Sequence, residues 1–101
     1  MKKAISLIEE NLPIGCSEIV SGGAGGIDSA AKILAERIDI KYTCFLPEYE
    51  KFGKEATLVR NKKIVEYSDQ VIAFWDFESK GTQNTIISSL ECNKPVRLIQ
   101  I

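Results

Sequence analysis

Residues 18–31 have the sequence EIVSGGAGGIDSAA, which changes within a few positions from a strand pattern to a helix pattern. Ile19 and Val20 favour a short strand over residues 18–21, and the glycines after Ser21 interrupt it. From Ile27 to Ile38 the apolar residues recur at helical spacing, i, i+3, i+4 and i+7. A strand, a glycine loop and a buried-face helix therefore follow one another without a linker.

The same alternation continues along the chain in both directions. Further helices are predicted at residues 3–12, 54–67 and 82–93, further strands at 42–46, 70–75 and 96–101, and a polar loop at 48–53. The almost uninterrupted apolar run 70–75 is typical of a central parallel strand. Because alternating helices and strands with short connections favour parallel pairing, we expect an α/β fold. The predicted architecture is a three-layer αβα sandwich around a Rossmann-like parallel sheet of about four strands.

Length and charge restrict the classes of function. A chain of 101 residues is large enough for one hydrophobic core, so a single domain over 1–101 is expected. Its 13 basic and 14 acidic residues give a net charge of −1, which provides no global positive field for a nucleic acid. The basic residues between Lys51 and Lys63 are interpreted as a solvated helix face, with Arg60 as an exception.

The inventory of reactive side chains excludes several kinds of site. Three widely spaced cysteines, Cys16, Cys44 and Cys92, form no CxxC pair, and there is no histidine to complete a zinc site. The lack of histidine also excludes Ser-His and Cys-His nucleophile pairs. No metal or cofactor is predicted. The reduced cysteines, and an N-terminus without an apolar signal region or membrane span, lead us to expect a cytoplasmic protein.

The loop from Ser21 to Asp28 joins a strand end to a helix N-terminus, where backbone N–H groups attract anions. Its glycines allow close approach of a phosphate, although a tight turn without a ligand would also use them. The spacing matches neither the dinucleotide fingerprint nor the Walker loop. Asp28 would either complement the helix dipole or bind a ribose hydroxyl.

A second loop, Asp76 to Thr82, leaves the strand at 70–75 in the same way. Ser79 and Thr82 add hydroxyl groups there, and Thr82 alternatively acts as an N-cap. In the preceding helix, Arg60 is suited to phosphate unless it is an exposed i,i+4 partner. Asn61 would read or brace a neighbour beside that phosphate, since asparagine has poor helix propensity and needs another reason for its place in a helix. The predicted ligand-binding residues are Ser21, Gly22, Gly23, Ala24, Gly25, Gly26, Asp28, Arg60, Asn61, Ser79, Gly81 and Thr82.

Residues 18–101 resemble the SLOG superfamily, which includes the DNA-processing DprA/SMF proteins and the LONELY GUY phosphoribohydrolases. Residues 21–31 are similar to the DprA motif SGxARGID, with Gly25 at the arginine position. The small YspA/YpsA-like branch is the most similar in pattern. The positions concerned are Pro47, 52–54, Arg60-Asn61, 73–75 and 79–82. The resemblance implies a Rossmann-like fold that recognises nucleotides or their derivatives.

Three functions follow from this resemblance. Binding or sensing of a nucleotide-type ligand at the two loops is the leading hypothesis. LONELY GUY enzymes carry a glutamate where this chain has Thr85, so hydrolysis of a nucleoside monophosphate would need Glu78 or Asp76 as the acid/base group. Binding of single-stranded DNA, as in DprA, is disfavoured by the net charge and by Gly25. A domain that keeps the fold without a working site is the fourth alternative.

SLOG proteins usually open with a strand, whereas this chain opens with a helix. The absence of that strand would leave unpaired edges on neighbouring strands, which need to be covered. We therefore expect a homodimer or a higher oligomer, an expectation that a stable monomer in light scattering would contradict.

Overall fold

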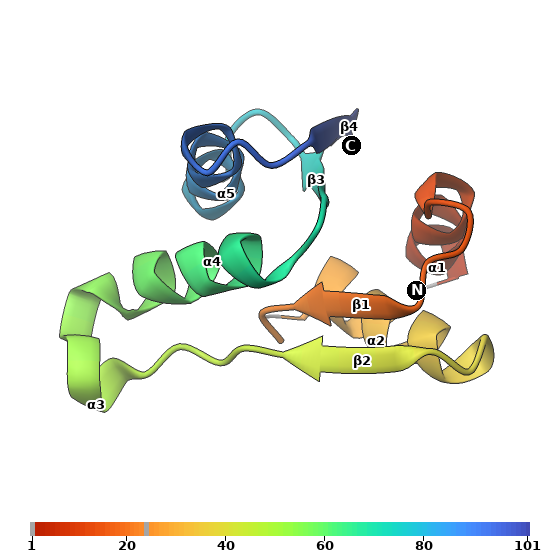
Figure 1. The fold of residues 1–101 in the computed structure, drawn as a ribbon, viewed down its shortest axis with the longest axis horizontal. Helices are drawn as coiled ribbons and strands as arrows, with labels where there is room; N and C mark the ends of the chain where they lie inside the picture. The colour runs from red at the N-terminus through yellow and green to blue at the C-terminus, as the bar shows by residue number, and fades with distance from the viewer. Residues whose placement is uncertain (1, 24) are drawn as a thin grey trace. The chain divides into compact units, whose positions relative to one another are not determined.

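The computed structural model describes residues 2–23 and 25–101, and the chain divides into two compact units, Met1–Phe45 and Leu46–Ile101. Each unit contains a helix, a strand, a second helix and a second strand in that order, and the two strands of each unit are parallel (Figure 1). The predicted α/β class is therefore confirmed, with the strands arranged as two parallel pairs. No helix among the described residues is long and apolar enough to cross a membrane.

The first unit is one β–α–β arrangement preceded by a helix. Its elements are α1 (Lys2–Asn11), β1 (Glu18–Ser21), α2 (Ile27–Arg37) and β2 (Lys41–Cys44). The register runs from Glu18 opposite Lys41 to Ser21 opposite Cys44. Helix α2 packs against both strands and against α1. The predicted strand 18–21 is confirmed, and so is the helix that follows the glycines.

The core of the first unit lies along the apolar stripe of α2. Ala30, Ala31, Leu34 and Ala35 are all buried, and Leu34 is 1% exposed. From α1, Ile5 and Ile8 are buried as well. Three alanines on one stripe leave little side-chain volume between the elements, so the helix can approach its neighbours closely. The periodicity seen in the sequence therefore reports a real buried face.

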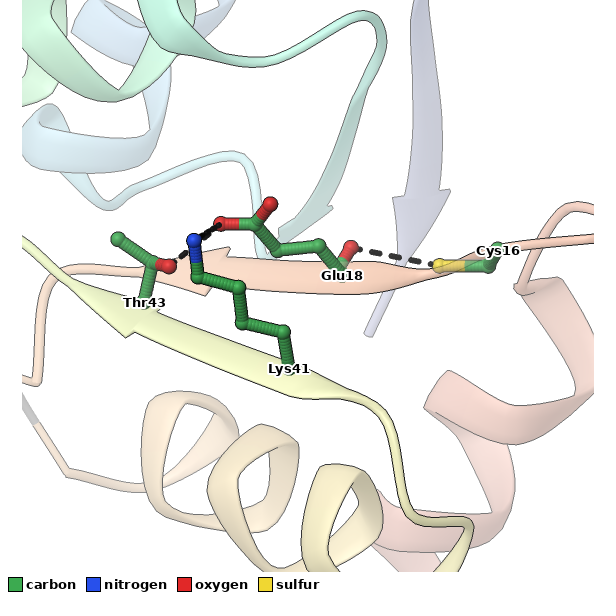
Figure 2. Close-up of polar contacts among 4 residues, drawn as sticks. All are labelled: Cys16, Glu18, Lys41 and Thr43. Atoms are coloured by element: carbon green, nitrogen blue, oxygen red, sulfur yellow. Dashed lines mark hydrogen bonds and ion pairs between the residues drawn. The ribbon is translucent and has the colours of Figure 1, made fainter.

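The two faces of the β1–β2 pair differ in chemistry. Ile19 and Ser21 are buried on the side of α2. On the other side the Glu18 carboxylate accepts a hydrogen bond from the Thr43 hydroxyl and lies 3.9 Å from the Lys41 ammonium nitrogen (Figure 2). The thiol of Cys16 donates to the backbone oxygen of Glu18 at 3.4 Å. Polar cross-strand contacts thus occupy the face away from α2, and the strands alternate as expected for a half-buried pair.

The second unit repeats this order after a short helical entry. Its elements are α3 (Tyr49–Phe52), the 3₁₀ turn η1 (Gly53–Glu55), α4 (Ala56–Tyr67), β3 (Val71–Trp75), α5 (Lys80–Glu91) and β4 (Val96–Gln100). β3 pairs with β4 from Val71 opposite Val96 to Trp75 opposite Gln100. Helix α5 packs against α4 and β3. Only Val71 and Ala73 of the apolar run are buried, and the other residues of β3 are half-buried.

The prediction of a polar loop at 48–53 is wrong, because this segment forms a compact helical turn. The backbone oxygen of Glu48 accepts bonds from Lys51 at 3.1 Å and Phe52 at 3.0 Å. Gly53, with φ of 56°, ends the turn. The Lys63 ammonium lies 2.7 Å from the Glu48 carboxylate, lowering its pKa, and 5.7 Å from the centre of the Phe52 ring. These contacts with α4 order a segment whose own sequence is polar.

The end of β2 and the start of α5 each differ from the prediction by two residues. β2 ends at Cys44 rather than at 46, because Phe45 makes a last bond to the Ser21 oxygen and Pro47 has no N–H to continue the ladder. Helix α5 begins at Lys80 rather than at 82, because Ser79 is its N-cap and accepts a bond from the Thr82 N–H. Thr82 is therefore not the N-cap.

Leu34→Ala is expected to lower the free energy of unfolding by about 2–5 kcal/mol, because it opens a cavity between α2 and its neighbours. Urea denaturation of the purified chain measures this loss. Leu90→Ala is the matched control, because Leu90 is 64% exposed on α5 and its truncation should change stability by no more than about 0.5 kcal/mol. Similar losses in both variants would contradict the position of the core.

Candidate functional site

The glycine loop after β1 adopts backbone conformations that residues with a Cβ rarely use. Gly23, Gly25 and Gly26 have φ of 68°, 99° and 56°. A Cβ built on Gly25 or Gly26 meets no atom within 4 Å, so glycine is needed here for its conformation and not for lack of space. Ala24, one of the predicted site residues, lies outside the described residues. The loop is therefore open on the side where Gly25 and Gly26 would carry side chains.

Helix α2 begins directly after this loop without a side-chain cap. Its N-cap is Gly26, which has no side chain to accept from the first-turn N–H groups, although the Asp28 N–H donates to the Gly25 backbone oxygen at 3.1 Å. Asp28 is the second residue of the helix, where a carboxylate complements the positive end of the dipole. Asp28 is therefore placed to complement the helix dipole, which is one of the two roles predicted for it. Binding of a ribose hydroxyl remains a prediction.

Ser21 is held at the end of β1 by a tyrosine that the sequence analysis missed. The hydroxyls of Ser21 and Tyr42 share a hydrogen bond, and Ser21 is buried. Burial raises the pKa of Tyr42, the Ser21 bond opposes that rise, and the charges of Cys44 and Asp28 add to it. Tyr42 therefore stays protonated at neutral pH and can donate or accept. Finding Tyr42 from the sequence would have required the register of β1 against β2, which the sequence does not reveal.

The loop after β3 is organised by Asp76. Its carboxylate accepts bonds from the backbone N–H groups of Glu78 and Ser79, each at 2.8 Å. Ser79 then caps α5, accepting from the Thr82 N–H at 3.4 Å and from the Thr82 hydroxyl at 3.3 Å. Gly81 follows in the first turn, and a Cβ there would meet nothing within 4 Å. This helix start is capped, in contrast to α2.

Asn61 connects α4 to the first turns of α5. Its side-chain oxygen accepts a bond from the Arg60 Nε at 2.9 Å, and its Nδ2 donates to the Asn84 Oδ1 at 3.3 Å and to the Gly81 oxygen at 3.5 Å. Asn61 is 7% exposed, and its bonds to α5 supply the further reason that an asparagine within a helix needs. Asn84 was missed, although its place inside a predicted helix gave the same signal.

The predicted residues thus gather in two groups, one in each unit. Arg60, Asn61 and Gly81 are joined directly by hydrogen bonds, and Ser79 and Thr82 lie in the turn beside Gly81. The second group surrounds the start of α2. It contains Ser21, Gly22, Gly23, Gly25, Gly26 and Asp28.

Asp76, one of the two carboxylates considered for catalysis, is poorly suited to acid/base work. Hydrogen bonds from the backbone N–H of Ser79 and Glu78 lower the pKa of Asp76, whereas a general acid needs a raised one. The Thr85 hydroxyl donates to the Gly81 oxygen at 3.1 Å. Among residues 2–23 and 25–101, no three His, Cys, Asp or Glu side chains gather as metal ligands.

A hollow in the second unit lies at the opposite end of β3 from the Asp76 loop. It has a volume of about 170 Å³ and is lined by Gln70, Val71, Pro95, Val96 and Arg97, where β3 and β4 begin. Pockets for small molecules usually measure about 300–1,000 Å³. The hollow therefore does not mark the candidate site, which lies where the strands end.

No protein-family model, curated protein or solved structure matches the chain. Any proposal about its function therefore rests on the geometry of the two loops.

Asn61→Ala is expected to lower the free energy of unfolding by about 1–3 kcal/mol, because it removes the partner of Arg60 Nε and Asn84 from a buried position. Urea denaturation measures the change. Asn11→Ala is the control, since Asn11 is half-buried and bonds only within α1, to the Leu7 oxygen at 2.8 Å. An equal loss in the two variants would contradict a connecting role for Asn61.

Because the pKa of Asp76 is lowered in the folded state, the free energy of unfolding depends on pH. The folded state binds the proton less well than the unfolded state, so the stabilisation is present above the unfolded pKa of about 3.9 and is lost as pH falls through the lower folded pKa. Wild type and Asp76→Ala should therefore differ in unfolding free energy at about pH 5 and converge towards about pH 2.

The control for this measurement is Asp76→Asn, whose amide oxygen can accept the same backbone bonds but does not titrate in this range. Its stability relative to Asp76→Ala should change little over the same range. A constant difference between wild type and Asp76→Ala would show that the carboxylate does not hold the loop.

Proposed function

We propose that the chain binds a phosphate-bearing nucleotide or nucleotide derivative at the loops that follow β1 and β3. The observation that carries this proposal is the start of α2. Its helix N-terminus has no side-chain cap and follows glycines with positive φ and open space beside them. Backbone N–H groups in this arrangement bind anions, and phosphate is the anion for which such loops are used most widely.

The second loop supports the proposal with a guanidinium and hydroxyl groups. Arg60 is oriented by its bond to Asn61, which in turn contacts the first turn of α5. Arg side chains fixed in this way suit phosphate because their donors match two oxygens at once. The expected three-layer sandwich, with one parallel sheet of about four strands, is part of the proposal, since it would bring both loops to one sheet edge.

Binding without catalysis fits the side chains better than hydrolysis does. Asp76 serves as an acceptor for its own loop, and Thr85 stands where the resembled enzymes carry a glutamate. The nucleic-acid alternative has no support from the net charge of −1. A binding or sensing module is therefore the function that we put forward.

Isothermal titration of the purified chain against AMP, ADP-ribose and NAD tests the proposal. At least one of these ligands should bind, and Arg60→Ala should weaken that binding about tenfold through the loss of a charged hydrogen bond. Arg97→Ala is the matched control, because Arg97 is exposed at the opposite end of the unit and should leave affinity unchanged. Absence of binding across the panel would refute the proposed function.

A further inference from the structure

An aromatic pair, the half-buried Trp75 and the exposed Phe77, stands at the end of β3. Trp75 is the last residue of the strand, and Phe77 follows two positions later with 52% of its surface exposed. The ring centroids are 4.7 Å apart, and the ring planes are inclined by 41°. Single exposed apolar side chains are common, but two aromatic rings in contact at a strand end form a defined surface.

The backbone at Phe77 is unfavourable for the residue it carries. Phe77 has φ of 66°, in the left-handed region that costs a bulky residue about 1 kcal/mol or more. Glycine would adopt this conformation without that cost. Phe77 therefore places a ring at a position where the backbone favours a residue without a side chain.

The pair is also fixed in place by hydrogen bonds. The Trp75 indole N–H donates to the Ser79 backbone oxygen at 3.0 Å, and the Asp76 carboxylate binds the N–H groups of Glu78 and Ser79. Rings held by the folded loop lose little conformational entropy when a planar ligand stacks on them. The surface is therefore preorganised.

The charged groups at the two ends of this loop favour different parts of a ligand. The Asp76 carboxylate and Glu78 flank Phe77, and an anion would be repelled there, whereas a neutral ring would not. The first turn of α5, at Lys80 and Gly81, offers the positive end of a helix instead. A ligand with a neutral aromatic ring at one end and a phosphate at the other matches this order.

We propose that Phe77, supported by Trp75, is a stacking platform for the aromatic base of the bound ligand. This inference rests on the proposed function and narrows it, because it requires an aromatic base and not only a phosphorylated sugar. Stacking of bases on aromatic side chains contributes substantially to affinity in many nucleotide-binding proteins.

Trp75 is the sole tryptophan of the chain, so its fluorescence reports on the platform directly. Titration with AMP should quench this fluorescence. Ribose 5-phosphate, which has the same sugar and phosphate but no base, should bind about tenfold or more weakly and cause no quenching. Equal affinity for the two ligands would overturn the platform while leaving phosphate binding intact.

Variants of Phe77 separate stacking from a structural role. Phe77→Gly removes the ring and relieves the strained φ, so the fold should be retained while the affinity for AMP falls to that for ribose 5-phosphate. Phe77→Tyr keeps a ring and should keep AMP affinity. Tyr49→Ala is the control, since Tyr49 is 61% exposed on α3, outside the loop.

Each contrary result has a distinct meaning. Unchanged AMP affinity in Phe77→Gly would overturn the platform but not nucleotide binding. The same result together with a changed sedimentation coefficient would assign the ring to a contact between protein chains and likewise overturn the platform. Failure of AMP, ADP-ribose, NAD and ribose 5-phosphate to bind wild type would refute both the platform and the proposed function.

Discussion

Parallel pairing is the constraint on which the rest of the structure depends. Two parallel strands cannot be joined by a tight turn, so the chain must return along a crossover, here α2 in the first unit and α5 in the second. Each crossover helix then begins beside the end of its first strand. The positions of the glycine loop and of the Asp76 loop are consequences of this geometry, whatever ligand they bind.

The crossover helices of the two units differ in how their first N–H groups are capped. In the first unit Gly26 provides a left-handed turn and no cap, so the N–H groups of α2 depend on a partner other than an N-cap side chain. In the second unit Asp76 and Ser79 supply side-chain acceptors for the loop and for α5. The uncapped start of α2 is suited to an anion. At α5 the capping side chains hold the loop in place, while the first turn at Lys80 and Gly81 still presents the positive end of the helix.

Asn61 shows how a polar residue becomes structural. Asn61 bonds to Arg60 on its own helix and to Asn84 and Gly81 on α5. An apolar side chain at the same position could not orient these neighbours. Its hydrogen bonds fix the direction of the Arg60 side chain and the spacing of two helices at once. Buried networks of this kind are sensitive to the loss of any member.

The sequence by itself determined the class and order of the elements. Helical spacing from Ile27 onward and the glycines before it predicted α2 and its loop, because amphipathic periodicity and the φ requirement of glycine are local properties. The short helix at 49–52 was predicted as a loop because its order depends on Lys63, which is distant in sequence. The start of α5 was placed late because Ser79, not Thr82, provides the cap.

Only the tertiary structure decided which side chains meet. Tyr42 reaches Ser21 because the register of β1 against β2 places them on one face, and Asn61 meets Asn84 because α4 packs on α5. The contact of Phe77 with Trp75 depends on a left-handed residue that no propensity favours. Such contacts arise between segments separated in sequence, or from locally unfavourable backbone, and neither leaves a periodic signal. The glycine loop could be identified from the sequence, whereas the residues that contact it could be identified only from the tertiary structure.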